Sequence, residues 1–209
     1  MKMNIKSAQI QTQDSVFKRI LWLYGLFTLL SNASFLVGYY LLPEGFMRKS
    51  PLMAAGELVA SAGSFWPHFG LTLLFNVGLV IVLGVGANLQ QVKSFPAGYL
   101  VPIFLGIGGG LIVGTNSFIA SDLSRYSVRD GMALGLSIGE LEMLAYIITI
   151  ASTVKFGIYQ YRNLADWKPT KVQRLCDVRL SRQEILCLII AVLLLIFAAY
   201  RETAMTVMP

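Results

Sequence analysis

The sequence predicts an all-α, polytopic integral membrane protein with about five transmembrane helices, and three observations support this fold class. The 209-residue chain is 56% hydrophobic and only 13% charged, and its mean hydropathy is +0.65, whereas soluble domains are about 25% charged. Five apolar runs reach the roughly 20 residues that a spanning helix needs. The Lys and Arg residues fall unevenly on the alternate loops between these runs, as is typical of multipass proteins.

The five predicted spans cover residues 20–42, 69–87, 99–120, 131–156 and 185–200. The chain shows no internal repeat and no low-complexity linker, so residues 1–209 are expected to form one transmembrane domain. About nineteen mostly polar residues precede the first run, and that run is too long for the apolar part of a cleaved signal peptide. We therefore expect the first span to be a retained signal anchor.

The distribution of basic residues predicts the orientation. One set of loops carries twelve of the 17 Lys and Arg residues, and the other set carries five. Because the richer side of a multipass protein faces the cytoplasm, we expect a cell-membrane protein with a cytoplasmic N-terminus and an extracytoplasmic C-terminus. The same distribution accounts for the net charge of +6, so the expected partner of these charges is the lipid bilayer and not a nucleic acid.

The predicted extracytoplasmic loop, residues 44–68, is expected to contain a short helix. Ser50 is a typical N-cap, and Pro51 suits the first helical position that follows it. The next apolar residues share one side of that helix, which favours a helix lying on the membrane surface. His68 follows the interfacial aromatic Trp66, and we expect it to be a wet interfacial residue, with a proton sensor or a ligand as the alternative.

The fourth span carries two acids, and a charged group within lipid needs a partner, a proton or a function. With about 100° per residue along a helix, one face collects three glycines and one acid, namely Gly131, Gly135, Gly139 and Glu142. Glu140 lies on roughly the opposite side. We therefore expect Glu142 to belong to a packing face and Glu140 to face water or a partner.

The third span carries a matching stripe of glycines at Gly106, Gly110 and Gly114. Small residues at every fourth position let two helices approach closely in lipid. The short loop over residues 121–130 makes the third and fourth spans antiparallel neighbours. We expect these two spans to pack glycine face to glycine face.

A polar centre is predicted around Glu142, which should lie near the middle of the bilayer. Three other spans bring an amide to intermediate depth, namely Asn32, Asn76 and Asn116, and Glu140 completes this candidate set. The fifth span has only Cys187 as a polar residue in its interior. We therefore expect spans one to four to surround the polar centre, with the fifth span outside them and facing lipid.

Two interpretations of Glu142 are open. In a structural role it is protonated and hydrogen-bonds an Asn or a backbone carbonyl group, which fixes helix packing. In a functional role it titrates or binds a cation during transport, since intramembrane acids commonly have such functions. We favour the structural role because transport usually needs a second ionisable group or a paired cation, and no Lys or Arg falls at the same depth in the sequence.

A short pattern connects these residues to a known family. The fourth span contains Gly-x-x-Glu-x-x-Ala at Gly139, Glu142 and Ala145, and the glycine-rich third span runs into Asn116. Over roughly residues 69–162 these features resemble the stage II sporulation protein M family.

The chain departs from that family at two positions of the fourth span. The family has a His-Gly pair where Ile138 precedes Gly139, and often a Pro where Leu144 stands. Members are polytopic membrane proteins without known enzymatic chemistry. Those of spore formers act in an engulfment complex that remodels peptidoglycan, and some relatives are encoded with exporter ATPases. The resemblance thus implies a membrane subunit of a larger assembly.

The longest predicted cytoplasmic segment, residues 159–183, has six basic residues and two acidic ones. One interpretation is positive charge resting on anionic lipid. The other is a docking element for a cytoplasmic partner such as an exporter ATPase, with candidate contacts Tyr161, Arg162, Trp167, Lys171 and Arg174. After it, Ser181 is a candidate N-cap of the fifth span, with Glu184 at the N3 position of a capping box.

The sequence contains no pattern that indicates an enzyme. Ser/His/Asp, Cys/His, HExxH and phosphate-loop motifs are all missing from it. It has one histidine, and its two cysteines lack the CxxC spacing of zinc sites. We therefore expect no catalytic activity, no metal and no cofactor.

These features favour a non-enzymatic multipass subunit, permease-like or scaffold, of a larger cell-envelope or export complex. Its expected partners are other membrane subunits and, as a candidate, a cytoplasmic ATPase. Two alternatives stay open. One is a self-contained carrier or channel that uses the intramembrane Glu142. The other is a component of a peptidoglycan-remodelling engulfment complex, which only the resemblance implies.

Overall fold

The computed structural model describes residues 15–117, 127–137, 139–163, 165 and 168–207. Four helices among them are long and apolar enough to cross a membrane, namely Val16–Leu41, Phe65–Asn88, Ala97–Gly114 and Arg182–Val207. They correspond to the first, second, third and fifth predicted spans. The protein is therefore a mostly helical membrane protein.

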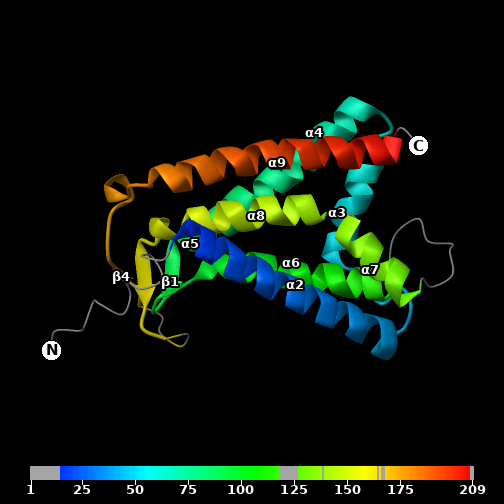
Figure 1. Ribbon diagram of the computed structural model, residues 1–209, viewed down its shortest axis with the longest axis horizontal. Coiled ribbons are helices and arrows are strands. Elements are labelled where there is room, and N and C mark those ends of the chain that lie inside the picture. Colours follow the sequence, from blue (N-terminus) through cyan, green and yellow to red (C-terminus); the bar gives the residue numbers. More distant parts are fainter. Residues whose placement is uncertain (1–14, 118–126, 138, 164, 166–167, 208–209) are drawn as a thin grey trace.

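Figure 1 shows the long helices running side by side between two different ends of the molecule. One carries four short strands, and we call it the sheet end. The other carries the short helix α3 (Pro51–Ala60), and we call it the α3 end. The first crossing, α2 (Val16–Leu41), runs from the sheet end to the α3 end. As predicted, Pro51 follows an N-cap, because Ser50 Oγ accepts a hydrogen bond from Met53 N at 3.4 Å.

The second crossing returns to the sheet end as three consecutive pieces. These are α4 (Phe65–Gly78), the π-helix η2 (Leu79–Val85) and the short α5 (Gly86–Asn88). A π-helix of this length is uncommon, and such segments frequently accompany functional sites. The third crossing consists of η3 (Ala97–Tyr99) and α6 (Leu100–Gly114), and leads back to the α3 end.

A four-stranded sheet closes the sheet end, where the prediction of an all-α fold had only loops. Its strands are β1 (Gln90–Val92), β2 (Phe95–Pro96), β3 (Tyr159–Tyr161) and β4 (Thr170–Lys171), in the order β2-β1-β3-β4. The parallel pairing of β1 with β3 joins two loops that are far apart in sequence. Strands of two or three residues are too short for an alternating pattern to reveal them.

The predicted continuous span over residues 131–156 is wrong, because two helices replace it. They are α7 (Val128–Ser137) and α8 (Glu140–Ser152), which the 3₁₀ turn η4 (Val154–Phe156) follows. Gly139 lies between them with φ +79°, a left-handed conformation that ends a helix and that glycine adopts without steric strain. The 13 residues of α8 rise only about 20 Å, short of the roughly 30 Å hydrocarbon layer.

The glycine stripe of α6 packs closely, but the predicted partner is wrong. A Cβ on Gly106 would lie 2.7 Å from Phe27 Cδ2, and a Cβ on Gly110 would lie 3.0 Å from Phe35 N. Both neighbours belong to α2. On the opposite side of this contact, a Cβ on Gly38 of α2 would lie 3.3 Å from the backbone of Gly114. The spacing of small residues therefore identified the close-packing face but not the helix that packs against it.

The last helix, α9 (Arg182–Val207), is a wall of the bundle, so the prediction that it lies outside the other spans is wrong. Figure 1 shows it packed along α8 and α4. One side buries Ala191, Leu195 and Ala199, while Phe197 on the other side is 57% exposed. The predicted capping box is present, since Ser181 N donates to Glu184 Oε2 at 2.7 Å and Glu184 N donates to Ser181 Oγ at 3.3 Å.

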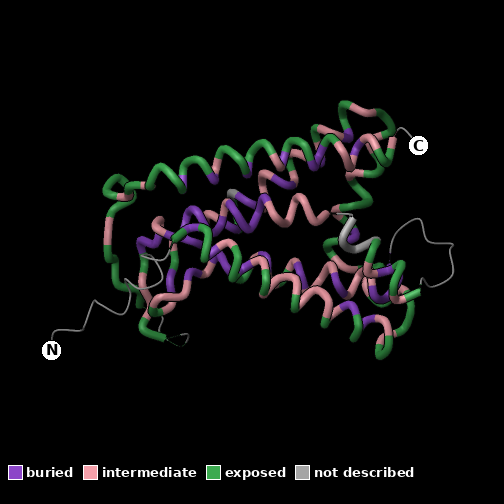
Figure 2. Tube along the Cα trace, in the orientation of Figure 1, coloured by how far each residue is buried: buried purple, intermediate pink, exposed green. Residues whose placement is uncertain are grey.

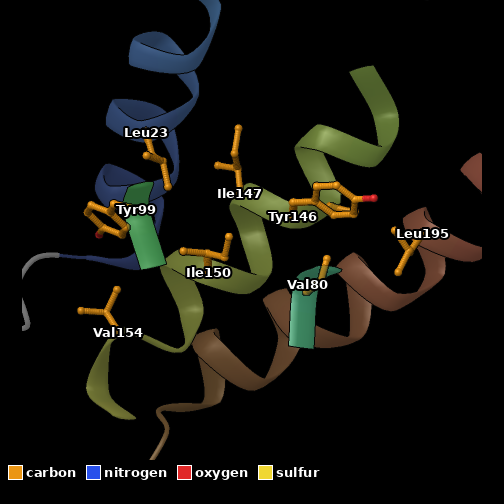
Figure 3. Packing of buried hydrophobic residues seen from close by; sticks show 9 residues of the cluster. Leu23, Val80, Tyr99, Tyr146, Ile147, Ile150, Val154 and Leu195 are labelled. Carbon is orange, nitrogen blue, oxygen red and sulfur yellow. The ribbon is translucent and has the colours of Figure 1, made fainter. Parts of the chain in front are cut away.

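An apolar core fills the half of the bundle next to the sheet end. Buried residues concentrate along α8, whereas the outer side of α9 is exposed (Figure 2). Leu23, Val80, Ile147, Ile150 and Leu195 meet there from α2, η2, α8 and α9 (Figure 3). Within a membrane such contacts stabilise the fold by van der Waals packing, since lipid tails are equally apolar. The half nearer the α3 end is packed less fully.

Candidate functional site

A cavity of about 460 Å³ lies between the helices in the half of the bundle nearer the α3 end. Its wall is mostly apolar and comes from the four long helices, from α7 and α8, and from the short α3. Its polar lining comprises Thr28, Ser31, Asn32, His68, Thr72, Asn76, Glu140, Glu142, Tyr146, Glu202 and Thr206. Among the described residues that line it there are three glutamates and no lysine or arginine. The cavity is thus an acidic space within the membrane-spanning bundle.

Glu142 is held in this cavity by a chain of two hydrogen bonds. Asn76 Nδ2 donates to Glu142 Oε1 at 2.6 Å, and Tyr146 Oη donates to Asn76 Oδ1 at 2.7 Å. Asn76 is the twelfth of the 24 residues of its crossing, Phe65–Asn88, so Glu142 lies near mid-depth. The predicted bond between this acid and an Asn is therefore present.

Glu140 borders the same cavity, so the prediction that it faces away from Glu142 is wrong. Its carboxylate accepts a hydrogen bond from the hydroxyl of Tyr24 on α2. Both acids stand in the first turn of α8, where the helix begins at the cavity. The two side chains do point to different neighbours, Glu140 toward α2 and Glu142 toward α4. Both still border the cavity, because it lies between those two helices.

A third acid, Glu202 of α9, completes the acidic lining and was missed in the sequence. It lies close enough to Glu142 for the two carboxyl groups to interact electrostatically. The predicted fifth span ends at residue 200, whereas α9 continues to Val207 and carries Glu202 within the bundle. A second cavity of about 150 Å³ lies beside these two acids, and Arg201 lines it.

His68 is buried, so the prediction of a wet interfacial residue is wrong. It is only 3% exposed, because α9 covers this turn of α4. Its Nδ1 lies 3.2 Å from Thr203 Oγ1 and 3.5 Å from Thr72 Oγ1. Its ring also lines the cavity. No sequence pattern indicates this burial, because the contact comes from a residue 135 positions away in the chain.

The three predicted amides have different positions. Asn76 contacts Glu142, as described above, and Asn32 lines the cavity while its Nδ2 donates to Thr28 O at 2.8 Å. Asn116 does not reach this site, which corrects the prediction. It lies beyond the end of α6 with φ +48°, and its Nδ2 donates to Glu44 Oε1 at 2.6 Å.

Two of the three glycines predicted to form the packing face of the fourth span belong to the cavity wall. Gly131 and Gly139 line the cavity, and a Cβ on Gly139 would have no neighbour within 4 Å. Gly135 lies within α7. Because the helix breaks at Gly139, a single helical phase does not apply to these glycines and Glu142 together.

The sheet-end side of the cavity is closed by the apolar core and by a buried ion cluster. Arg19 Nη2 and Lys155 Nζ each lie 2.7 Å from a carboxylate oxygen of Glu184. The Arg19 and Glu184 side chains are 5% and 3% exposed, respectively. These contacts tie the starts of α2 and α9 to the turn η4 that follows α8.

The predicted docking residues lie at the sheet end. Tyr161 closes β3 opposite Val92, and Lys171 lies in β4. Arg162, Lys171 and Arg174 are exposed. Trp167 lies outside the described residues. These side chains lie at the sheet end of the bundle, and the described ones among them do not line the acidic cavity.

No family model, curated protein or solved structure matches this chain. The resemblance to the stage II sporulation protein M family therefore stays a prediction. Among the described residues, no group of three or more His, Cys, Asp or Glu side chains is placed to hold a metal ion. The cavity therefore offers carboxyl groups and other hydrogen-bonding groups within mostly apolar walls.

Proposed function

We propose that this protein is a membrane carrier that binds a small solute in the acidic cavity. The cavity itself is the observation that supports this function most directly. In the sequence, transport was disfavoured because Glu142 lacked a second ionisable group. Glu140, Glu202 and His68 line the same space, which removes that objection. An ionisable cluster at this depth is costly to maintain, and such groups commonly mark solute or ion pathways.

The break between α7 and α8 supports the same proposal. Irregular backbone is tolerated at membrane depth where it lines a cavity, and Gly139 does so. Carriers commonly place their binding sites at discontinuous helices, whose free ends contact the solute. Here α8 begins at the cavity with two of its three acids.

Closure at one end favours a carrier over a channel. The apolar core and the Glu184 cluster separate the cavity from the sheet end. A carrier alternates between states that open to one side at a time, whereas a conducting channel requires a continuous path. We assign this structure to the state in which the sheet end is shut.

We further propose five crossings, with α7 and α8 together as the fourth, and a cytoplasmic sheet end in the cell membrane. The charge distribution supports this orientation. The described basic residues of the sheet end are Lys18, Arg19, Lys93, Lys155, Arg162, Lys168, Lys171, Arg174, Arg179 and Arg182, whereas the α3 end has Arg48, Lys49, Arg129 and Arg201. The N-terminus is then cytoplasmic and the C-terminus extracytoplasmic.

Reconstituted protein tests the carrier proposal. Charge movement would be recorded from proteoliposomes on a solid-supported membrane while amines, amino acids and inorganic cations are applied one at a time. At least one solute should give a current that the Glu142→Gln variant lacks. The Glu57→Gln variant is the matched control, because Glu57 is exposed on α3 and does not line the cavity. Equal currents from wild type and Glu142→Gln would reject the proposal.

A second candidate function is membership of a larger envelope or export assembly, with other membrane subunits or a cytoplasmic ATPase. The surface of the sheet end supports it, because Val172 and Leu175 are 51% and 55% exposed among exposed basic side chains. An engulfment role rests on the family resemblance alone. Affinity purification from native membranes followed by mass spectrometry is the test. Purification without any co-eluting subunit would count against this candidate.

A further inference from the structure

We propose that the cavity binds an organic cation, an amine or onium group attached to an apolar body, in competition with protons. The proposal rests on the proposed function only in taking the cavity as the solute site. It goes further in naming the chemical class of the solute. Three features support it: the sign of the charge around the cavity, the size and apolar character of its walls, and an unused hydrogen-bonding atom on a buried histidine.

The charged groups favour a cationic ligand. Glu140 and Glu142 come from α8, and Glu202 comes from α9. The remaining titratable groups around Glu142 are Tyr146 on α8, Arg201 on α9, His68 on α4 and, through Glu140, Tyr24 on α2. Arg201 can neutralise one carboxylate at most. The other acids must carry protons or face a cation, because uncompensated charge within low-dielectric surroundings is costly.

The size and walls of the cavity favour an organic cation over a metal ion. Its volume of about 460 Å³ falls in the range of pockets that hold drug-sized ligands, roughly 300–1,000 Å³. Phe27, Phe35 and Phe75 line it, and the backbone of Gly109 leaves room beside them. Aromatic faces of this kind attract onium groups. A bare metal ion would need a compact ligand cluster, and the described residues contain none.

His68 gives an independent sign of a ligand. It is 97% buried, being 3% exposed, and it lines the cavity. Its Nδ1 contacts two threonines, whereas its Nε2 has no hydrogen-bond partner among the described residues. When Nδ1 carries the ring proton and donates it to Thr203, Nε2 is a hydrogen-bond acceptor. The N–H group of a bound amine would then donate a hydrogen bond to Nε2.

Equilibrium dialysis of the full-length protein in lipid nanodiscs, with radiolabelled tetraphenylphosphonium, tests the charge requirement. This cation should bind saturably, and the equally shaped anion tetraphenylborate should not. Glu142→Gln and Glu202→Gln should each weaken binding at least tenfold, while Glu57→Gln should leave it unchanged. Saturable binding of both ions alike, or unchanged cation binding in both cavity variants, would overturn the proposal.

A steric pair of variants separates loss of the site from loss of the fold. A Cβ on Gly109 would have no neighbour within 4 Å, so Gly109→Leu should fill the cavity without disturbing its walls. Gly25 is equally unhindered but exposed, and it does not line the cavity. Gly109→Leu should weaken tetraphenylphosphonium binding at least tenfold and Gly25→Leu should not. Equal binding by the two variants would show that the cation binds elsewhere.

Competition with protons gives a separate readout. Adding tetraphenylphosphonium to lightly buffered protein should release protons, and binding should weaken as the pH falls. Binding without proton release and without pH dependence would overturn this part of the proposal. Cation binding without any transport current would reject the carrier function and leave the ligand class in place. Transport of an anionic or neutral solute, without cation binding, would reject the ligand class and leave the carrier function in place.

Discussion

The buried carboxylate of Glu184 allows a quantitative test of how the sheet end is held together. We consider the Glu184→Gln substitution. Gln keeps the shape of the side chain and the N3 residue type of a capping box, so the start of α9 should retain its cap. What the variant loses is the charge that faces Arg19 and Lys155, each 2.7 Å away.

The expected destabilisation follows from the burial of the pair. The Arg19 and Glu184 side chains are 5% and 3% exposed, so Glu184→Gln removes a negative charge that faces a buried guanidinium group. Such a change costs about 3–5 kcal/mol. One kcal/mol shifts the melting temperature by about 2–4 °C for a chain of this size. We therefore expect the melting temperature to fall by roughly 6–20 °C.

Thermal unfolding of detergent-solubilised protein, followed by circular dichroism, would measure this change. Lys155→Met is the matched control, because the Lys155 side chain is 31% exposed and an exposed ion pair contributes about 1 kcal/mol or less. The double variant Arg19→Met with Glu184→Gln should recover part of the loss, since it also removes the buried guanidinium group. Equal effects of Glu184→Gln and Lys155→Met, or no recovery in the double variant, would refute the reasoning.

Three further predictions concern other parts of the molecule. Gly110→Leu should lower the melting temperature or abolish folding, because a Cβ there meets the α2 backbone, whereas Gly109→Ala should be tolerated; size-exclusion chromatography and thermal unfolding distinguish them. In intact cells, a membrane-impermeant maleimide should label the exposed Cys176 only after permeabilisation and leave the buried Cys187 unlabelled in both cases; labelling of intact cells would reverse the proposed orientation. Asn76→Ala removes the amide that donates to Glu142, and since such bonds to charged groups contribute about 1.5–3 kcal/mol, tetraphenylphosphonium binding should weaken about tenfold or more in equilibrium dialysis.

Local patterns in the sequence were sufficient where the structure depends on neighbouring residues. Ser50 with Pro51, and Ser181 with Glu184, predicted the starts of α3 and α9 from groups no more than three residues apart. The apolar runs likewise predicted the four long helices, because spanning length and hydropathy are properties of a single segment. Neither signal depends on how the helices are arranged.

The sequence patterns did not show which helices pack against each other. The stripe through Gly110 marks a face that packs closely, yet its spacing does not tell which helix packs against it. His68 and Glu202 became site residues only because α4 and α9 lie side by side. The comparison of side-chain directions on either side of Gly139 also required an unbroken helix. The helix is broken there, because Gly139 has a positive φ.

The helix break and the acids are best understood as one feature. Ending α7 at Ser137 and starting α8 at Glu140 places a helix N-terminus at the cavity, within the bundle. The first turn of a helix has N–H groups without intrahelical partners and a partial positive charge, which stabilise nearby carboxylates. Glu140 and Glu142 stand in that turn. An unbroken span would place both acids in a helix interior, where this stabilisation is absent. The Gly-x-x-Glu pattern therefore marks the start of a helix at mid-depth, and with it a position where negative charge can be kept in the membrane.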